Sequence, residues 1–143
     1  MTRGDIQTLF AGREQAWRDR DAEALAASHA ERCTVASPMF TTVRGRKDIL
    51  EAYRSLFRIF PDWTLTGEEL VIDGDRVAQP FTTTATHVGE FMGLDGTGRR
   101  FTIQGVLLYR LEDGLIVDER RIYDFTGLLV QIGLLKTKPA RTA

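Results

Sequence analysis

The segment from Leu115 to Phe125 (LIVDERRIYDF) brings together side chains that could move a proton or hold a negatively charged oxygen. Alternate side chains of a strand point to opposite faces, and the odd-numbered face is the more apolar one here, so we expect it to face inward. That face carries Val117, Glu119, Arg121 and Tyr123. A buried charge is costly unless it is paired or lines a wet pocket. The pattern therefore predicts a pocket where Glu119 and Arg121 either pair directly or act as a carboxylate base beside an enolate-stabilising guanidinium.

The register of this strand leaves a second interpretation open. A slip of one residue exchanges the two faces, and Glu119 and Arg121 would then form a surface pair without a functional role. In the expected register, Ile116 and Ile122 lie on the outer face, where they would serve a contact between two copies of the chain. A homodimer is therefore the expected assembly.

Two further side chains are candidates for acid/base chemistry. Asp124 ends the strand before an apolar segment, so its carboxylate could cap the first turn of a helix or, facing a cavity, act as a general base. His87 lies near the end of another expected strand, where it could exchange protons near neutral pH or serve as a hydrogen-bonded structural histidine. With Glu119 and Arg121, these residues form the predicted catalytic set.

Aromatic and apolar side chains could line a small-molecule pocket with hydroxyl groups at its edge. The candidate ligand-binding residues are Trp17, Tyr53, Phe57, Phe91, Leu107, Tyr109 and Tyr123. A chain of this size needs most of its aromatic residues in the core. We therefore expect only a minority, such as Trp17, Tyr53 and Tyr109, to touch a ligand.

A metal site is not expected. His29 is predicted on a helix four residues before Cys33, a spacing that could bring two soft ligands together. No third or fourth ligand accompanies them, and the single cysteine cannot form an internal disulfide. We expect neither a metal nor an organic cofactor.

Helical spacing of apolar residues predicts the elements that open the chain. A first helix is expected over 6–17, and Asp21 can cap a second that continues to about Glu31. The amphipathic segment 49–60 predicts a third helix, ended by Pro61. These helices come before most of the predicted strands, so they are expected to cover one face of a sheet.

The later part of the chain alternates with a period of two, which is typical of strands. Segment 33–43 is rich in β-branched residues, but Pro38 indicates an edge strand or a bulge. Short turns, among them Asp113-Gly114, separate further strands expected at 63–72, 76–88, 100–111 and 115–125. Such a meander is antiparallel, with Phe101, Ile103, Leu107 and Tyr109 facing inward. The predicted fold class is α+β.

Composition sets the broad class of the protein. The chain has 143 residues, 43% of them hydrophobic and 27% charged, which fits one domain over 1–143 with a flexible tail at 136–143. Its 19 basic and 20 acidic residues leave a net charge of −1, so no field favours nucleic acid or an anionic membrane. No apolar run approaches the ~20 residues of a membrane helix, and a cytoplasmic location is expected because no leader segment is apparent.

Several short motifs, in this order and spacing, resemble the SnoaL-like branch of the nuclear-transport-factor-2-like superfamily. The resemblance covers nearly the whole chain and rests on Gly45, Phe60-Pro61-Asp62, Thr86-His87-Val88-Gly89-Glu90-Phe91-Met92-Gly93, Thr97-Gly98-Arg99, Tyr123-Asp124, Gly127-Leu128-Leu129 and Gln131-Ile132-Gly133. It implies a cone-shaped α+β barrel with a pocket between sheet and helices, commonly a homodimer. It also implies, for some members, aldol-type cyclisation of polyketide esters without a cofactor.

The resemblance also shows where this chain departs from the family pattern. Such cyclases place an acid/base Asp three residues before the Asp of the Tyr-Asp pair and a His about fourteen residues upstream of it. Here those positions hold Arg121 and Leu107. Two functions therefore stay open. The protein is either a cyclase or isomerase that acts on a small hydrophobic carbonyl compound, or a binding domain that has lost the acid and holds a ligand carboxylate through Arg121.

Overall fold

The computed structural model describes residues 1–136 and 138 and has the predicted α+β fold. Apart from 136 and 138, the predicted tail at 136–143 lies outside the described residues. The elements are α1 (Arg3–Asp19), α2 (Ala22–Ala27), β1 (His29–Ser37), β2 (Thr41–Arg44), α3 (Arg46–Ile59), β3 (Thr64–Gly67), β4 (Val71–Asp73), β5 (Arg76–Thr86), β6 (Arg100–Glu112), β7 (Leu115–Tyr123) and α4 (Phe125–Ile132).

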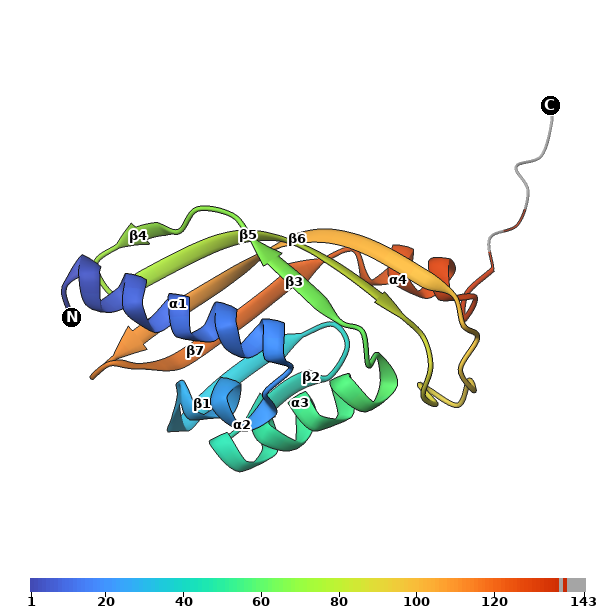
Figure 1. Ribbon diagram of the computed structural model, residues 1–143, viewed down its shortest axis with the longest axis horizontal. Coiled ribbons are helices and arrows are strands. Elements are labelled where there is room, and N and C mark those ends of the chain that lie inside the picture. Colours follow the sequence, from blue (N-terminus) through green and yellow to red (C-terminus); the bar gives the residue numbers. More distant parts are fainter. Residues whose placement is uncertain (137, 139–143) are drawn as a thin grey trace.

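The strands form one curved sheet in the order β2-β1-β7-β6-β5-β3, with β4 paired to β5 (Figure 1). The predicted meander is confirmed, since β5 pairs with β6 and β6 with β7 in antiparallel register. A parallel pairing of β1 with β7, which the meander pattern does not predict, joins the first half of the chain to the last strand. The sheet curves past α1 and α3 without closing on itself, so these helices complete the interior.

The third helix is confirmed with nearly the predicted bounds. In α3, the buried residues Ile49, Tyr53, Leu56 and Ile59 recur every three or four positions, so one stripe faces the sheet. The predicted inward residues of β6 (Phe101, Ile103, Leu107 and Tyr109) are all buried. None of the described helices is both long and apolar enough to cross a membrane.

The second helix is shorter than predicted. Asp21 caps it as expected, accepting a hydrogen bond from the backbone of Ala24, but the helix ends at Ala27. His29 begins strand β1 and pairs with Ile116 of β7, so the predicted helical position of His29 is wrong. A helix this short is only marginally stable by itself, and pairing with a central strand satisfies the backbone better.

The segment 33–43, predicted from Pro38 to be an edge strand or to hold a bulge, divides into the interior strand β1 and the edge strand β2. β1 lies between β2 and β7, while Pro38 falls in the turn that joins β1 to β2. A proline in the turn removes no ladder hydrogen bond from β1. The turn also brings Phe40 over the interior, where the side chain is half-buried.

A β-bulge divides the last strand into two parts with opposite parity. Tyr109 pairs with Glu119, but Leu111 pairs with Ile116, so Val117 is the extra residue. Beyond the bulge the odd-numbered side chains face inward as predicted. Before the bulge, the even-numbered side chain of Ile116 faces inward instead, and it is 0% exposed. The predicted place of Ile116 on the outer face is therefore wrong. Ile122 is exposed as predicted, and the homodimer stays a prediction.

Candidate functional site

Five polar side chains from four elements meet inside the molecule and are called here the buried polar cluster. Its members are Arg13 of α1, His29 of β1, Tyr53 of α3, and Glu119 and Arg121 of β7. All except Arg121 are buried, and the Arg121 side chain is only 14% exposed. The parallel pairing of β1 with β7 sets His29 opposite Ile116, and the His29 side chain reaches the Glu119 carboxylate from there.

Glu119 is the centre of charge in this cluster. One carboxylate oxygen, Oε2, accepts a hydrogen bond from Nε of Arg121 at 2.5 Å. The other, Oε1, lies 3.6 Å from Nη2 of Arg13 and 3.6 Å from Nε2 of His29 and accepts no hydrogen bond from the described residues. Burial alone would raise the pKa of Glu119, but Arg121 and Arg13 outweigh it and lower the pKa to about 2. Glu119 is therefore a permanent carboxylate and a poor proton acceptor.

His29 is held in its neutral form. Burial lowers its pKa to about 3, and the nearby guanidinium groups act in the same direction, against the attraction of Glu119. With His29 neutral, the two arginines and one glutamate leave the cluster with a net charge of about one positive unit. A buried positive charge without a full partner is stabilised by a negative or strongly polarised oxygen nearby.

The hydroxyl of Tyr53 connects the members of the cluster. Its oxygen lies 3.1 Å from Nη2 of Arg121, 3.4 Å from Nη2 of Arg13 and 3.2 Å from Nε2 of His29. The guanidinium of Arg121 also lies over the Tyr53 ring, 5.3 Å from its centroid. Trp17 packs edge-on against the same ring, which fixes the tyrosine from the α1 side.

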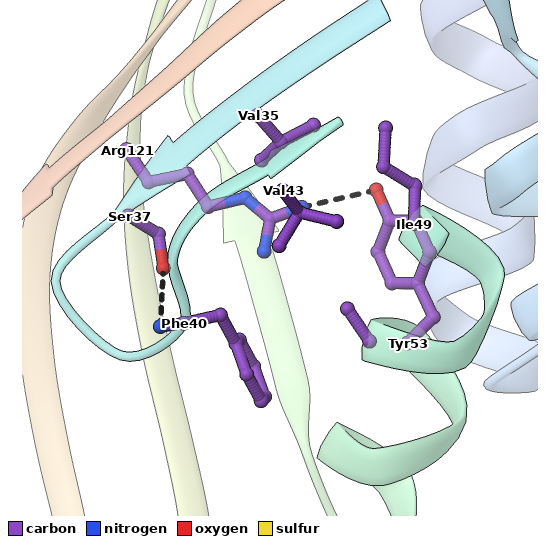
Figure 2. Close-up of a pocket in the computed structure, with 8 residues that line it drawn as sticks. Val35, Ser37, Phe40, Val43, Ile49, Tyr53 and Arg121 are labelled. Atoms are coloured by element: carbon purple, nitrogen blue, oxygen red, sulfur yellow. Dashed lines mark hydrogen bonds between the residues drawn. The ribbon is translucent and has the colours of Figure 1, made fainter. Parts of the chain in front are cut away.

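Two narrow cavities open beside this cluster, and Arg121 and Phe40 line both. Figure 2 shows the first, where the Arg121 guanidinium points at the Tyr53 hydroxyl and Phe40 lies across from it. The other residues around this first cavity are Val35, Ser37, Val43, Ile49 and Ala52. The second is lined by Trp17, Met39, Leu56, Trp63, Leu65, Phe81, Ile103, Leu107 and Tyr123. Each has room for about one water molecule, so a larger ligand requires lining side chains, such as the shared Phe40, to move.

The structure brings together only part of the predicted ligand-binding set. Trp17, Tyr53, Leu107 and Tyr123 line the cavities. Phe57 packs on Trp17, Phe91 packs on Phe60, and Tyr109 lies beneath the Arg13 guanidinium, so these three lie outside both linings.

The predicted catalytic residues also separate into two places. Glu119 and Arg121 lie in the buried polar cluster, as the inward register requires. Asp124 is exposed and caps α4, because its carboxylate accepts the backbone N–H of Gly127 at 2.8 Å. His87 is buried beside Thr97 and the Phe60 ring and lines neither cavity.

The sequence patterns did not single out Arg13. It occupies a buried position on the apolar stripe of α1, between Phe10 and Trp17, where a charged residue is costly. That position in the periodic pattern is the signal that could have identified it. Nη1 of Arg13 donates to Ser28 Oγ, which ties α1 to the start of β1. Among the described residues, no group of three or more His, Cys, Asp or Glu side chains is placed to hold a metal ion.

Solved structures with this fold are numerous, and some of them, including the two described here, show sequence similarity as well. AclR from Streptomyces galilaeus, described as a proposed hydroxylase, is 28% identical, with a TM-score of 0.81, over 96% of this chain and 87% of that chain. IdmH from Streptomyces antibioticus, described as a proposed polyketide cyclase, is 31% identical, with a TM-score of 0.73, over 89% of this chain and 97% of that chain. These descriptions differ, so the fold does not determine the reaction.

Curated relatives match over a shorter segment. Nogalonic acid methyl ester cyclase from Streptomyces nogalater is 47% identical over 47 residues, which are 33% of this chain and 35% of that protein. Aklanonic acid methyl ester cyclase DnrD from Streptomyces peucetius is 43% identical over 47 residues, 33% of this chain and 32% of that protein. The match thus spans about a third of the length of these relatives.

A sequence model of the family described as SnoaL-like polyketide cyclase matches residues 8–132, which include every member of the buried polar cluster. This match agrees with the motifs and with the curved α+β sheet. The chain belongs to the SnoaL-like polyketide cyclase family.

Proposed function

We propose that the protein binds a small hydrophobic polyketide-type molecule by a carbonyl oxygen and promotes its ring closure without a cofactor. The observation that carries this proposal is the position of Arg121, whose guanidinium lines both cavities while Glu119 and Tyr53 hold it in place. Fixed N–H donors aimed at an oxygen that becomes negative are among the strongest contributors to catalysis.

The charge of the cluster supports the same ligand chemistry. Glu119 offsets one of the two guanidinium charges, and an enolate oxygen beside Arg121 would offset the other. The linings are mainly apolar, and Val35, Val43 and Ile49 are among the residues around the first cavity. In such surroundings the attraction between a guanidinium and an oxyanion is stronger than in water.

The proposed reaction is an intramolecular aldol-type closure, the reaction that the SnoaL-like resemblance implies for some members of the family. The carbon next to the ester carbonyl loses a proton and becomes an enolate, whose oxygen lies against Arg121. The enolate carbon then bonds to a second carbonyl carbon of the same molecule, and the oxygen of that carbonyl takes up a proton. The product is an isomer of the substrate, so no oxidant, reductant or cofactor is consumed.

A second candidate function is ligand binding without turnover. It is favoured by the absence of any carboxylate or imidazole from the described linings of the two cavities. Nη1 of Arg121 donates no hydrogen bond within the described residues, so the guanidinium could hold a ligand carboxylate. Aromatic or fatty acids, rather than esters, would then be the ligands.

The test uses purified protein and nogalonic acid methyl ester, with product detected by liquid chromatography and mass spectrometry. The proposal expects a new compound of unchanged mass, formed at least ~100-fold more slowly by Arg121→Gln. Arg120→Gln is the matched control, because Arg120 is the next residue of β7 and is exposed.

The outcomes separate the two candidate functions. If Arg121→Gln converts the ester as fast as the wild type does, the role proposed for Arg121 is contradicted. A rise in melting temperature with aromatic acids but no ester conversion supports binding alone. The absence of both responses rejects both functions.

A further inference from the structure

Two buried polar atoms beside the second cavity have no hydrogen-bond partner within the described residues. They are Nε1 of Trp63 and Oγ1 of Thr83. An indole N–H or a hydroxyl that is removed from water without a hydrogen bond destabilises the folded chain. Native structures keep few such atoms, and each one needs an explanation. In the wall of an apolar cavity, the explanation is a ligand that supplies the missing partner.

Both residues belong to the wall of the second cavity. Trp63 lines it directly. Thr83 is 0% exposed and lies on the inward face of β5, where Phe81 is its neighbour on the same strand. The sheet register places Thr83 opposite Leu65 of β3 and Ile103 of β6. All three of these neighbours line the second cavity, so a ligand that widens the cavity at this wall meets Thr83.

The surrounding structure fixes both side chains before any ligand arrives. The Trp63 ring packs on Phe60 and Phe101, with ring centroids 5.7 Å and 5.8 Å apart. The backbone oxygen of Trp63 also accepts a hydrogen bond from Nε of Arg20 at 3.0 Å. Thr83 is held in an interior strand that pairs on both sides. Groups that are already ordered lose little freedom on binding, so their hydrogen bonds can contribute to affinity.

The chemistry of the two atoms limits the ligand group that they can bind. An indole N–H can only donate, whereas a hydroxyl can donate or accept. Among the described residues that line the second cavity, Arg121 alone is charged. Arg121 pairs with Leu107, which lies four residues along β6 from the partner of Thr83, a separation of roughly 13 Å along the strand. The group that fits Trp63 and Thr83 is therefore an uncharged oxygen, either a hydroxyl or a carbonyl.

We propose that Trp63 and Thr83 form a second oxygen-binding subsite, which takes a hydroxyl or carbonyl oxygen at the end of the ligand away from Arg121. The proposal rests on the proposed binding of a small molecule in these cavities, but not on its ring closure. It makes the ligand a mainly apolar molecule with an oxygen at each end. A ligand with a hydrocarbon end would leave both polar atoms unpaired.

Two aromatic acids that differ by one oxygen test the subsite. 2-Naphthoic acid and 6-hydroxy-2-naphthoic acid both offer a carboxylate to Arg121, and only the second carries a hydroxyl at its far end. We expect the wild type to bind the hydroxylated acid about tenfold more tightly, because a buried hydrogen bond contributes roughly that factor. Calorimetric titration measures both affinities.

Two variants assign the preference to the subsite. Thr83→Val removes the hydroxyl and keeps the shape of the side chain, and Trp63→Phe removes the N–H and keeps an aromatic ring. Each should reduce the tenfold preference to about threefold or less. Thr82→Val is the matched control, because Thr82 is the next residue of β5 and its side chain points to the opposite face. It should leave the preference unchanged.

The stability of Thr83→Val without ligand gives an independent measurement. Replacing an unpaired buried hydroxyl by a methyl group removes a destabilising feature, so the melting temperature of the variant should rise above that of the wild type. A fall in melting temperature would show that the hydroxyl has a structural partner in the free protein. That result contradicts the proposal, even if the variant still folds and binds both acids.

The titrations separate this proposal from the proposed function. Equal affinity of the wild type for the two acids overturns the subsite and leaves ligand binding in the cavities intact. The same equality is expected if a trapped water already partners both polar atoms. A preference that persists in both Thr83→Val and Trp63→Phe also overturns the subsite. Binding of neither acid rejects the subsite together with the second candidate function, whereas conversion of nogalonic acid methyl ester decides ring closure separately.

Discussion

The two histidines of the chain are both 0% exposed, yet they lie in opposite kinds of surroundings. His29 lies in the buried polar cluster, beside Glu119 and in contact with Tyr53. His87 lies towards α4, where Nδ1 accepts a hydrogen bond from the backbone of Thr97 and the ring packs against Phe60.

The difference teaches which buried ionisable group belongs to a site. Thr97 also donates its hydroxyl to the backbone oxygen of Ile132, so His87 and Thr97 together hold the loop after β5 against the end of α4. His29, in contrast, reaches a cavity through the Tyr53 hydroxyl. Burial alone does not distinguish the two histidines, whereas a link from the buried ring to a cavity-lining polar atom does.

The largest loss of stability is expected from a substitution at the centre of the buried polar cluster. Glu119→Ala leaves two guanidinium groups without their shared carboxylate, and the loss of a buried partner costs about 3–5 kcal/mol of unfolding free energy. At the other histidine, Thr97→Val removes neutral hydrogen bonds worth about 1 kcal/mol each. Urea denaturation of both variants measures the contrast. Equal, small losses would mean that water enters the cluster and that the comparison between the two regions is wrong.

The pH dependence of stability is the next largest effect. Burial lowers the pKa of His29 from 6.5 to about 3, so the unfolded chain binds a proton below pH 6.5 that the folded chain does not. Stability is therefore lost as pH falls from about 6.5 towards 3, and between pH 7 and 5 the loss from this group is about 2 kcal/mol. The lowered pKa of Glu119 acts in the same direction, from 4.5 down to about 2.

Urea denaturation at pH 7 and pH 5 measures this loss of unfolding free energy. His29→Gln should lose the His29 contribution and show a flatter dependence than the wild type over this range. A slope unchanged by His29→Gln would show that the histidine titrates like a free one, which contradicts its neutral state in the cluster.

A smaller effect, on ligand affinity, is expected from a substitution that widens access to the cavities. Phe40 lines both cavities, so Phe40→Ala should join them and tighten the binding of a multi-ring aromatic ester about tenfold, or about 1.4 kcal/mol. Phe91→Leu, in the His87 region, should leave this affinity unchanged, because Phe91 packs on Phe60 and Phe125 and lines neither cavity. Calorimetric titration compares the two. Unchanged or weaker binding by Phe40→Ala would contradict the role of Phe40 as the barrier.

Local periodicity predicted the parts of the fold that depend on neighbours in sequence. The stripe of α3 and the antiparallel meander follow from spacings of three to four and of two residues. The parallel pairing of β1 with β7 joins distant segments, and no local pattern encodes it. The bulge at Val117 was hidden because Leu115, Ile116 and Val117 are all apolar, so either parity fits this stretch.

The same limits explain what could be predicted of the site. Glu119 and Arg121 were assigned to the interior because the odd-numbered face is the more apolar one. The assignment is correct since both residues lie beyond the bulge, where the strand alternates regularly. His29 was not connected with them, since its contact with Glu119 depends on the β1–β7 pairing. Arg13 was visible as a charge on an apolar stripe, but its partner Glu119 lies far away in sequence.

The smallest effect decides whether Asp124 is only a helix cap. Asp124 and Asp21 make the same contact, each accepting a backbone N–H in the first turn of its helix, at 2.8 Å and 3.0 Å. Asp124→Ala and Asp21→Ala should each cost about 1 kcal/mol of unfolding free energy and leave ester turnover at the wild-type level. A selective loss of turnover in Asp124→Ala, at equal stability, would make Asp124 part of the reaction. The candidate site would then extend to the α4 end of the molecule, and the separation of the buried polar cluster from the structural region around His87 would fail.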